Sequence, residues 1–395
     1  MAFKTIRDLD LNNKRVLLRA DLNVPARKGK VTDTARIDRL KPTIDYLRQK
    51  GAKTLILSHF GRPDGEHNPQ MSLAFLLPAL QDAWGVPIKF AQDCIGSKAE
   101  SVANTLNPGD VALLENVRFH KGEETNDPAF IKELAKQGDI YVNDAFSVSH
   151  RAHASTEGLA HHLPAAAGFL MEEELNALDR ALENPARPVA AIAGGSKIST
   201  KLKILNNLVG KVDFLILGGA MANTFIYAMG GSVGLSLCEK DMADEARKIM
   251  EHAKTSGCKI LLPIDSVTVT AIQPGADYTV CDSANVPPDR MAIDVGPKTI
   301  AHILEEIKNC KTLVWNGPLG IFEIKPFDEG TNALAKALAE RTKTGNLISI
   351  AGGGDTAAAL ENAGAAHDLT YISTAGGAFL EWLEGHTLPG VAALL

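Results

Sequence analysis

The stretch Val189-Ala-Ala-Ile-Ala-Gly-Gly-Ser-Lys197 is an unbroken apolar run that ends in two glycines and a lysine. A short continuous apolar run, rather than an alternating one, is typical of a parallel strand that is covered on both faces. The glycines that follow let the backbone turn sharply and bring its N–H groups close to a bound anion. The same pattern recurs along the chain, and it decides the fold.

Apolar runs of strand length are each followed by glycine or polar residues and then, in many cases, by an amphipathic stretch. Besides Val189–Ala193, the expected strands are Arg15–Ala20, Thr54–Ser58, Val86–Phe90, Val111–Leu114, Ile140–Asn143, Phe214–Leu217, Ile260–Pro263, Thr312–Trp315, Leu347–Ala351 and Leu369–Ser373. The expected helices include Ala35–Gln49, Asp127–Gln137, Asp241–Thr255 and Thr331–Arg341. This alternation predicts parallel sheets with right-handed crossovers, and hence doubly wound α/β folds.

The chain has 395 residues, which predicts two or three domains at about 150 residues each. The expected strands are too many for one open sheet, so two sheets are favoured. A break is expected near Glu172–Pro188, where the charged helix Glu172–Asn184 is stopped by Asn184-Pro-Ala-Arg-Pro188.

Composition excludes several classes of protein. The net charge is −6, so no overall field attracts nucleic acid or a membrane, and any anion site must be local. Five scattered cysteines indicate reduced thiols rather than a disulfide framework or a zinc site. The uncharged stretch Phe214–Cys238 is long enough to span a bilayer, but its glycines divide it into a strand, a helix and a loop. With no signal peptide expected, the cytoplasm is the predicted location.

Four expected strands of the second half end in glycine-rich turns, which predicts a nucleotide site at their carboxyl ends. The turns are Gly194-Gly-Ser-Lys197, Gly218-Gly-Ala-Met221, Asn316-Gly-Pro-Leu-Gly320 and Gly352-Gly-Gly-Asp-Thr356. Lys197 is expected to open a helix with Lys201 on the same face, where a polyphosphate would favour both lysines; alternatively, they are solvated surface lysines. Asp355 is expected to hold Mg²⁺ or, alternatively, to cap a helix, and Thr356 to cap it or touch a phosphate.

Basic residues recur near the ends of the expected first-half strands. They are Arg36, His59, Arg62, Arg118, His150 and Arg151, with Asp21 and Asn23 nearby. Arginine forms forked contacts with phosphate and carboxylate, so this set suggests a site for a small anion with several charges. Each residue also has a plain alternative: a solvated arginine, an ordinary hydrogen-bonded histidine, or an ion pair between Asp21 and a nearby arginine.

Several motifs then resemble the signatures of the phosphoglycerate kinase family, in family order and over almost the whole chain. In the first half they are Arg19-Ala-Asp-Leu-Asn-Val-Pro25, Ser58-His-Phe-Gly-Arg-Pro63, Glu115-Asn-Val-Arg-Phe119, Asn143-Asp-Ala-Phe146 and His150-Arg-Ala-His153. In the second half they are Gly194–Lys197, Trp315-Asn-Gly-Pro-Leu-Gly-Ile-Phe-Glu323, Gly352–Thr356 and Ser373-Thr-Ala-Gly-Gly377.

The resemblance implies an α/β fold of two Rossmann-like three-layer domains, each with a mainly parallel sheet, joined by a hinge helix. Residues 1–171 with the C-terminal segment 382–395 would bind the substrate, residues 172–188 would connect, and residues 189–381 would bind the nucleotide. The implied activity is reversible, Mg²⁺-dependent phosphoryl transfer between 1,3-bisphosphoglycerate with ADP and 3-phosphoglycerate with ATP. The implied partners are these small molecules, with no nucleic acid and no membrane, and the implied state is a monomer.

The resemblance also implies roles for individual residues. The substrate would be bound by Asp21, Asn23, Arg36, His59, Arg62, Arg118, His150 and Arg151. The nucleotide would be bound by Gly195, Lys197, Lys201, Gly218, Gly219, Asn316, Pro318, Glu323, Gly353, Gly354, Asp355 and Thr356, with Asp355 on Mg²⁺ and Glu323 on the ribose. Without the resemblance, Glu323 would be taken for a solvated loop carboxylate. The catalytic positions would be Arg36, Lys197, Gly376 and Gly377.

Some positions depart from the usual family pattern. Ala20 and Leu22 are interpreted as packing changes, and Ser147-Val-Ser149 replaces a more typical Gly-Thr-Ala run. Ala375 replaces a glycine in the last glycine-rich loop, where the backbone would approach the transferring group. None of these changes removes a charged residue of the expected site.

The acceptor carboxylate is already ionised at neutral pH, so the transfer needs no general base. An expected site rich in Arg, Lys and Gly agrees with catalysis by positioning and charge neutralisation, with Lys197 and Arg36 stabilising the transferring phosphoryl group. Because the two clusters lie in different halves, transfer is expected to require closure of the halves. Two other classes remain open from the residues alone: an NAD-dependent dehydrogenase of similar fold, and a non-catalytic anion-binding protein.

Overall fold

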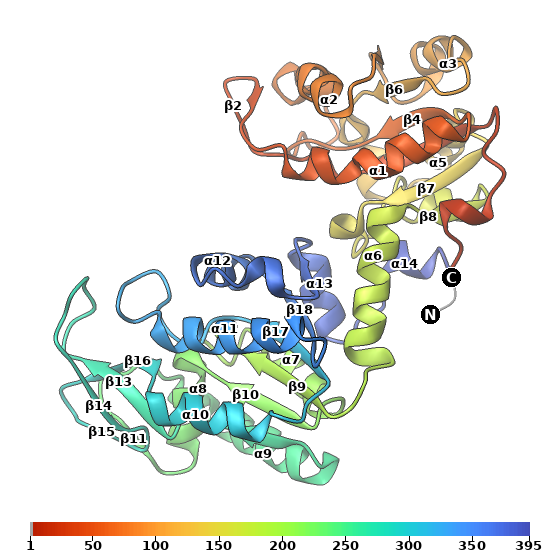
Figure 1. Cartoon of the computed structure of the whole chain (residues 1–395). Helices are drawn as coiled ribbons and strands as arrows, with labels where there is room; N and C mark the ends of the chain where they lie inside the picture. Colours follow the sequence, from red (N-terminus) through yellow and green to blue (C-terminus); the bar gives the residue numbers. More distant parts are fainter. Residues whose placement is uncertain (1–2) are drawn as a thin grey trace. The chain divides into compact units, whose positions relative to one another are not determined.

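The computed structural model describes residues 3–395, which form two compact units (Figure 1). The first unit contains residues up to Leu175 together with Thr387–Leu395, and the second contains Asn176–His386. Each unit is built on a six-stranded sheet whose strand pairs are all parallel. The expected doubly wound α/β fold is therefore confirmed.

The first sheet has the strand order β5-β6-β4-β1-β7-β8. Its strands are β1 (Arg15–Ala20), β4 (Lys53–Leu57), β5 (Ile88–Ala91), β6 (Val111–Leu114), β7 (Ile140–Asp144) and β8 (Ala165–Ala167). The helices of this unit are α1 (Ala35–Gln49), α2 (Leu77–Trp84), α3 (Gly96–Asn104), α4 (Lys121–Glu124), α5 (Pro128–Ala135) and the C-terminal α14 (Pro389–Ala392). A two-stranded hairpin, β2 (Ala26–Arg27) and β3 (Lys30–Val31), lies outside the sheet.

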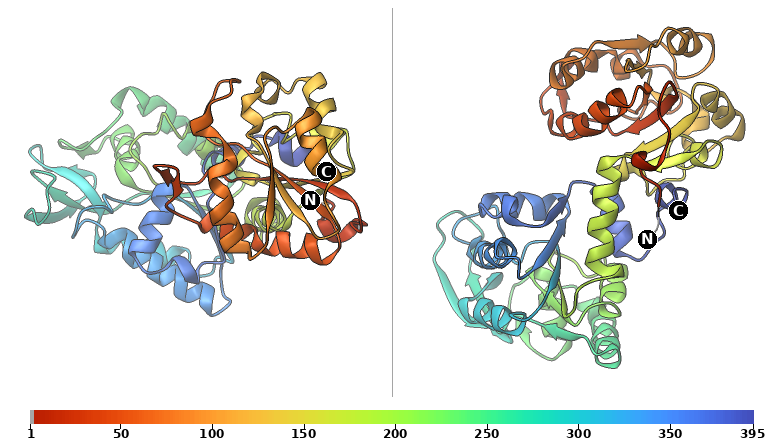
Figure 2. Two further views of the ribbon diagram at one scale, coloured as in Figure 1. Left: turned by 90° about the horizontal axis from the view of Figure 1, so that it is seen from above. Right: turned by 45° about the vertical axis from the view of Figure 1, so that its right-hand side comes forward.

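The second sheet has the order β12-β10-β9-β17-β18-β19. Its strands are β9 (Val189–Ala193), β10 (Phe214–Leu217), β12 (Lys259–Leu261), β17 (Thr312–Asn316), β18 (Ile348–Gly352) and β19 (Tyr371–Ser373). The helices are α7 (Leu202–Val209), α8 (Gly219–Ala228), α9 (Ala243–Ser256), α10 (Pro297–Glu306), α11 (Glu329–Lys343), α12 (Gly354–Asn362) and α13 (Gly377–Leu383). Helices cover both faces of each sheet, because the strand order reverses direction within the sheet (Figures 1 and 2).

The sheet strands were well predicted because they are buried on both faces. The main-sheet strands β1, β6, β9 and β17 are buried at nearly every residue, and every expected strand is present within two residues of its expected bounds. β8 was not expected, since three alanines carry little strand signal. The antiparallel sheet β14-β13-β16 was also missed; it comprises β13 (Asp265–Val269), β14 (Tyr278–Asp282) and β16 (Met291–Val295), and β14 is largely exposed. A short pair, β11 (Ser232–Val233) and β15 (Asn285–Val286), completes the list.

Two expectations about the connections between units need correction. The connecting helix α6 (Phe169–Leu178) begins three residues before the expected Glu172 and is followed by a π-helical turn, Asp179–Glu183. The expected C-terminal return at Trp382 is wrong, because Trp382 belongs to the second unit and the return begins at Thr387. The reason is packing: Trp382 is buried against Phe379, and Asn207 Nδ2 of α7 donates to Leu383 O at 2.8 Å.

The structure also bears on the cysteines and on the uncharged stretch 214–238. All five cysteines are free. The uncharged stretch 214–238 forms β10, α8 and β11, and among residues 3–395 no helix has the length and apolarity that crossing a bilayer requires.

Candidate active site

Four glycine-rich turns of the second unit lie together at one edge of its sheet. They follow β10, β9, β17 and β18, which are consecutive neighbours in a parallel sheet, so their carboxyl ends share an edge. Two of the turns interlock: a Cβ on Gly194 would lie 1.9 Å from Pro318 O, and one on Gly317 would lie 2.2 Å from Gly194 O. The first two meet as well, since Met221 N–H donates to Gly195 O at 2.9 Å. The edge is therefore a close-packed backbone surface.

Lys201 connects these turns through its side chain. Its Nζ donates to Asn316 Oδ1 at 2.6 Å and to Asn316 O at 3.2 Å, and Asn316 Nδ2 donates to Gly352 O at 2.8 Å. Burial lowers the pKa of Lys201 to about 8, while the charge of Asp355 opposes this shift. A buried ammonium beside neutral oxygens gains from a nearby anion. A phosphate bound beside Lys201 would therefore be stabilised by the charge of this ammonium group.

The loop that carries Lys197 differs from expectation. Lys197 does not open a helix, because α7 begins only at Leu202 with Lys201 as its N-cap residue. Residues 194–201 instead form an irregular loop, since Gly195 has φ +146° and Glu239 clamps the backbone and hydroxyl of Ser199 at 3.0 and 2.6 Å. Lys197 is exposed on this loop, so the two lysines do not share a helical face.

The turn Gly352–Thr356 and the later glycine-rich loop Ser373–Gly377 present mainly backbone groups. Gly353, with φ +97°, is the N-cap of α12, so Asp355 lies within the first turn and is not the cap residue. Thr356 is buried, and its Oγ1 accepts Gly317 N–H at 2.7 Å. Gly354 and Gly376 each have open space where a Cβ would point. Ala375, the departure from the family pattern, is buried beside them, and its N–H donates to Ser373 Oγ at 3.2 Å.

Gly218, Gly219 and Glu323 are the other residues that were expected to bind the nucleotide. Gly218 packs on Leu319, and Gly219, with φ +66°, donates its N–H to Leu319 O at 2.7 Å. Glu323 is exposed on the loop between β17 and α11. The structure therefore brings together Gly195, Lys201, Asn316, Pro318 and the Gly353–Thr356 turn. The exposed position of Glu323 does not by itself indicate a role.

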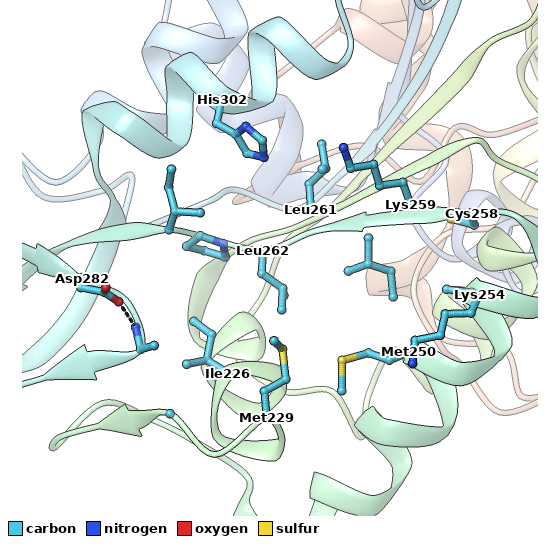
Figure 3. Close-up of a pocket in the computed structure, with 16 residues that line it drawn as sticks. Ile226, Met229, Met250, Lys254, Cys258, Lys259, Leu261, Leu262, Asp282 and His302 are labelled. Atoms are coloured by element: carbon cyan, nitrogen blue, oxygen red, sulfur yellow. Dashed lines mark hydrogen bonds between the residues drawn. The ribbon is translucent and has the colours of Figure 1, made fainter.

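A cavity of about 770 Å³ in the same unit lies elsewhere (Figure 3). It borders β12, the outer strand of the sheet, and is lined mainly by apolar side chains such as Ile226, Met229 and Met250. None of the four glycine turns lines it, so we do not assign the nucleotide to this cavity.

In the first unit, the expected basic residues follow β1, β4, β6 and β7, whose carboxyl ends share one edge. Arg118 is buried, and its Nη1 donates to Gly61 O at 2.9 Å. Arg151 Nε donates to His150 Nε2 at 3.3 Å. The pKa of His59 is lowered well below its usual value, first by burial and then by the charges of Arg19, Arg118 and Arg151. Three arginines therefore converge on His59.

The same field acts on His153. Its pKa is lowered to about 4, mainly by burial and then by the charges of Arg118, Arg151 and Arg19. Both histidines are therefore neutral at neutral pH. The three arginines outnumber the nearby carboxylates, Glu123 and Glu124, and such a positive cluster favours a bound anion.

A second group lies around Asp21. Arg36 Nη1 contacts Asp21 Oδ2 at 2.6 Å and Asn23 O at 3.1 Å, and Ser147 Oγ donates to Asp21 Oδ2 at 2.5 Å. Asn23 Oδ1 accepts Gly61 N–H at 3.2 Å, so Gly61 links this group to Arg118. Arg62 is exposed beside Gly61.

Sequence reasoning missed three contributors. Arg19 is buried in β1, with Nη2 at 3.1 Å from His59 Nδ1 and Nε donating to Ser155 Oγ at 2.9 Å. His153 and Ser147 also belong to the cluster. Arg19 could have been identified from the sequence, because an arginine within an otherwise apolar strand is rarely buried unless it has a partner.

Comparisons with known proteins identify a family for this chain. A family model described as phosphoglycerate kinase matches residues 6–386. The chain is 59% identical over 394 residues to the phosphoglycerate kinase of Agrobacterium fabrum, covering 100% of this chain and 98% of the relative. It is 57% identical over 394 residues to that of Rhodospirillum centenum, with 100% of both chains covered.

Solved structures give the same result. Phosphoglycerate kinase from Coxiella burnetii matches with a TM-score of 0.93 and 43% identity, covering 100% of this chain and 99% of that one. The enzyme from Pyrococcus horikoshii OT3 matches with a TM-score of 0.79 and 30% identity, covering 99% and 98%.

Proposed function

This chain belongs to the phosphoglycerate kinase family, and from that premise we propose which of its residues carry out the reaction. The reaction is the reversible transfer of a phosphoryl group between 1,3-bisphosphoglycerate with ADP and 3-phosphoglycerate with ATP, a step of glycolysis and gluconeogenesis. The dehydrogenase and the non-catalytic binding protein, which the residues alone left open, are set aside by this membership. The location that we propose for the protein is the cytoplasm, and its proposed state is a monomer.

The first unit binds 3-phosphoglycerate or its acyl phosphate. The proposal is supported by the convergence of Arg19, Arg118 and Arg151 on two neutral histidines. Guanidinium groups make paired hydrogen bonds to phosphate and carboxylate, and the substrate carries both. Asp21 and Asn23 are suited to the substrate hydroxyl, because a carboxylate oxygen and an amide oxygen can each accept a hydrogen bond from it. His150 and Arg62 complete the proposed substrate-binding set.

The second unit binds the nucleotide. Backbone N–H groups of the Gly353–Gly354 turn, at the start of α12, favour a bound phosphate, and Lys201 supplies a positive charge beside them. Lys197 is proposed to reach the transferring phosphoryl group from its exposed loop, Glu323 to receive the ribose, and Gly218, Gly219, Asn316 and Pro318 to shape the base and phosphate site. Gly376 and Gly377 are proposed to face the transferring group.

Asp355 would hold Mg²⁺, because it is an exposed carboxylate at the phosphate turn and Mg²⁺ is usually bound by one or two carboxylates together with substrate phosphates. When bound, the cation neutralises charge on the phosphate oxygens. Asp355 also raises the pKa of Lys201 by its charge, so the two side chains act on one region.

The transfer step is then one of positioning. The carboxylate oxygen of 3-phosphoglycerate attacks the γ-phosphorus of ATP in line, a new O–P bond forms, and the bond to the β-phosphate oxygen breaks as ADP leaves. No proton has to move, since the attacking carboxylate is already ionised. Arg36 and Lys197 are proposed to stabilise the charge on the equatorial oxygens.

One experiment tests the function directly. Purified protein is mixed with ATP, Mg²⁺ and 3-phosphoglycerate, and ADP formation is followed by a coupled assay. Turnover is expected only when all three are present, and excess chelator should stop it. Glycerate without its phosphate serves as the control acceptor, because it lacks the group that the arginines grip. An absence of turnover with 3-phosphoglycerate would reject the proposal.

A further inference from the structure

Three potential metal ligands converge away from the residues assigned to substrate and nucleotide. Asp93 and Cys94 follow β5, and His120 follows a short 3-10 helix, Val117–Phe119, after the neighbouring strand β6. One ligand atom from each residue lies within 4.8 Å of the other two. The convergence arises because β5 and β6 are parallel neighbours whose carboxyl ends meet at one sheet edge.

The present contacts hold two of these groups in place. His120 Nε2 lies 2.7 Å from Asp93 Oδ1, and the imidazole stacks on Phe130 with the ring centroids 5.1 Å apart. Asp93 Oδ1 also accepts the N–H of Cys94 at 2.8 Å. Both the carboxylate and the ring are therefore oriented by interactions other than the one between them.

The thiol differs from its two neighbours. Cys94 is fully buried, and its thiol forms no disulfide. The side chains of Asp93 and His120 are about one-third exposed, at 33% and 29%. The cluster thus has an inner sulfur ligand and an outer side that solvent can reach, which provides both a binding point and an entry path.

We propose that Asp93, Cys94 and His120 bind a zinc-type divalent cation, with water as the fourth ligand. Sulfur with imidazole nitrogen and one carboxylate oxygen is a ligand set for Zn²⁺, whereas Mg²⁺ prefers oxygen alone. Three protein ligands with an open fourth position are common in zinc sites that exchange a ligand. The site would therefore select a cation other than the Mg²⁺ of the reaction.

Binding requires a small rearrangement. With Zn–S about 2.3 Å and Zn–N or Zn–O about 2.0–2.2 Å, tetrahedral ligand atoms lie roughly 3.2–3.7 Å apart. The thiol must move inward, and the contact between His120 and Asp93 must lengthen. The competing explanation is an ordinary hydrogen bond that ties two loops together beside an inert thiol.

Occupancy would affect the substrate cluster. His120 lies two residues after Arg118, whose Nη1 donates to Gly61 O and whose Nε contacts Glu124 at 3.2 Å. A shift of His120 would displace this arginine through the 3-10 turn between them. We expect zinc to raise the KM for 3-phosphoglycerate more than the KM for ATP. This consequence rests on the proposed role of Arg118, but the binding does not.

Cobalt provides the probe, because a tetrahedral Co²⁺–thiolate site has a charge-transfer band in the near ultraviolet and strong visible bands. Chelator-treated full-length protein is titrated with Co²⁺, which is then displaced with Zn²⁺. One equivalent should give both bands in the wild type. Cys94→Ser should lose the charge-transfer band, and His120→Gln should bind at least about tenfold more weakly. Cys258→Ser, which removes a buried thiol from the other unit, should titrate like the wild type.

The outcomes separate the alternatives. A wild type without a thiolate band overturns the site, as does an unchanged band in Cys94→Ser. If Cys94→Ser does not fold, Asp93→Asn is used as the ligand variant in its place. The amide oxygen of the substituted side chain can still accept the hydrogen bonds from the backbone N–H groups, so the loop should keep its structure. In assays at buffered free Zn²⁺, a raised KM for 3-phosphoglycerate in the wild type and not in His120→Gln supports the coupling. Binding without any change in KM refutes the coupling, and absent activity with Mg²⁺ present and no zinc added refutes the proposed function instead.

Discussion

Lys201 Nζ lies 2.6 Å from the side-chain oxygen of Asn316 and 3.2 Å from its main-chain oxygen. The two residues are far apart in the sequence and meet because α7 begins, and β17 ends, at the carboxyl edge of the second sheet. Neutral oxygens satisfy the hydrogen bonds of the ammonium group but do not balance its charge. This explains why burial brings the pKa of Lys201 down to about 8.

Nucleotide binding is expected to take up a proton near Lys201. A bound polyphosphate favours the charged ammonium, so the pKa rises on binding, and protein that was deprotonated above about pH 8 gains a proton. Affinity for ADP should therefore fall as pH rises through this value. Calorimetry at one alkaline pH in buffers of different ionisation enthalpy measures the uptake, and Lys201→Met should abolish it. Equal proton uptake in both proteins would contradict the assignment.

Arg36→Ala should lower kcat by orders of magnitude, with a smaller effect on KM for 3-phosphoglycerate, because Arg36 is proposed to act on the transferring group. The matched control is Arg39→Ala on the same helix. Arg39 contacts Glu173 at 3.4 Å, so its loss should leave kcat within about twofold. Steady-state kinetics of both variants decide the matter, and similar kcat values in the two would remove Arg36 from the transfer step.

Lys197→Ala should also lower kcat by orders of magnitude while leaving the fold intact, because this lysine is exposed on its loop. Lys203→Ala on the exposed face of α7 is its control and should behave as the wild type. Single-turnover measurements with saturating ATP separate the transfer step from product release. Wild-type transfer in Lys197→Ala would assign its role to another group.

Two glycines should respond to substitution in opposite ways. Gly194→Ala would place a Cβ 1.9 Å from Pro318 O, so the turns must separate and stability should fall by several kcal/mol. Gly354→Ala has open space at the start of α12, so its thermal midpoint should stay the same or rise slightly. ADP affinity should nevertheless drop in Gly354→Ala, because the methyl group would occupy the proposed phosphate side. Thermal unfolding and ADP titration of both proteins test this contrast.

Asp294 should make stability depend on pH. Its pKa is raised from the usual 3.8 to about 7, mainly by burial; the N–H groups of Gly330 and Val295 oppose the shift, and the charges of Asp328 and Glu329 add to it. Between these two values the folded state holds more protons than the unfolded state, so the free energy of unfolding falls as pH rises toward and through 7. Asp294→Asn removes this contribution.

The measurement compares urea midpoints of the wild type and Asp294→Asn at about pH 5.5 and about pH 8.5. The wild type should lose more stability than the variant over this interval, because other titrating groups are common to both proteins. Parallel changes in the two midpoints would contradict a raised pKa at Asp294.

Much of the fold could be predicted because its signals are local. Runs such as Val189–Ala193 and Phe214–Leu217 are apolar throughout, and strands buried on both faces must be so. Parallel order then places every turn after a strand at one edge, which is how Lys201, Asn316 and Gly353 could be grouped without coordinates. The helix expected at Lys197 is absent because Ser199 donates hydrogen bonds to Glu239, which is too far away in the sequence for a local pattern to reveal.

What the sequence by itself determined is the α/β class, the paired sheets, the glycine turns and the family. What only the tertiary structure decided is which distant groups meet. Arg19 next to His59, Ser147 on Asp21, and His120 beside Asp93 and Cys94 each join segments whose neighbourhood depends on strand order and register. The physical reason is range: apolar periodicity and turn chemistry act over a few residues, whereas charge, burial and pKa depend on everything packed around a side chain.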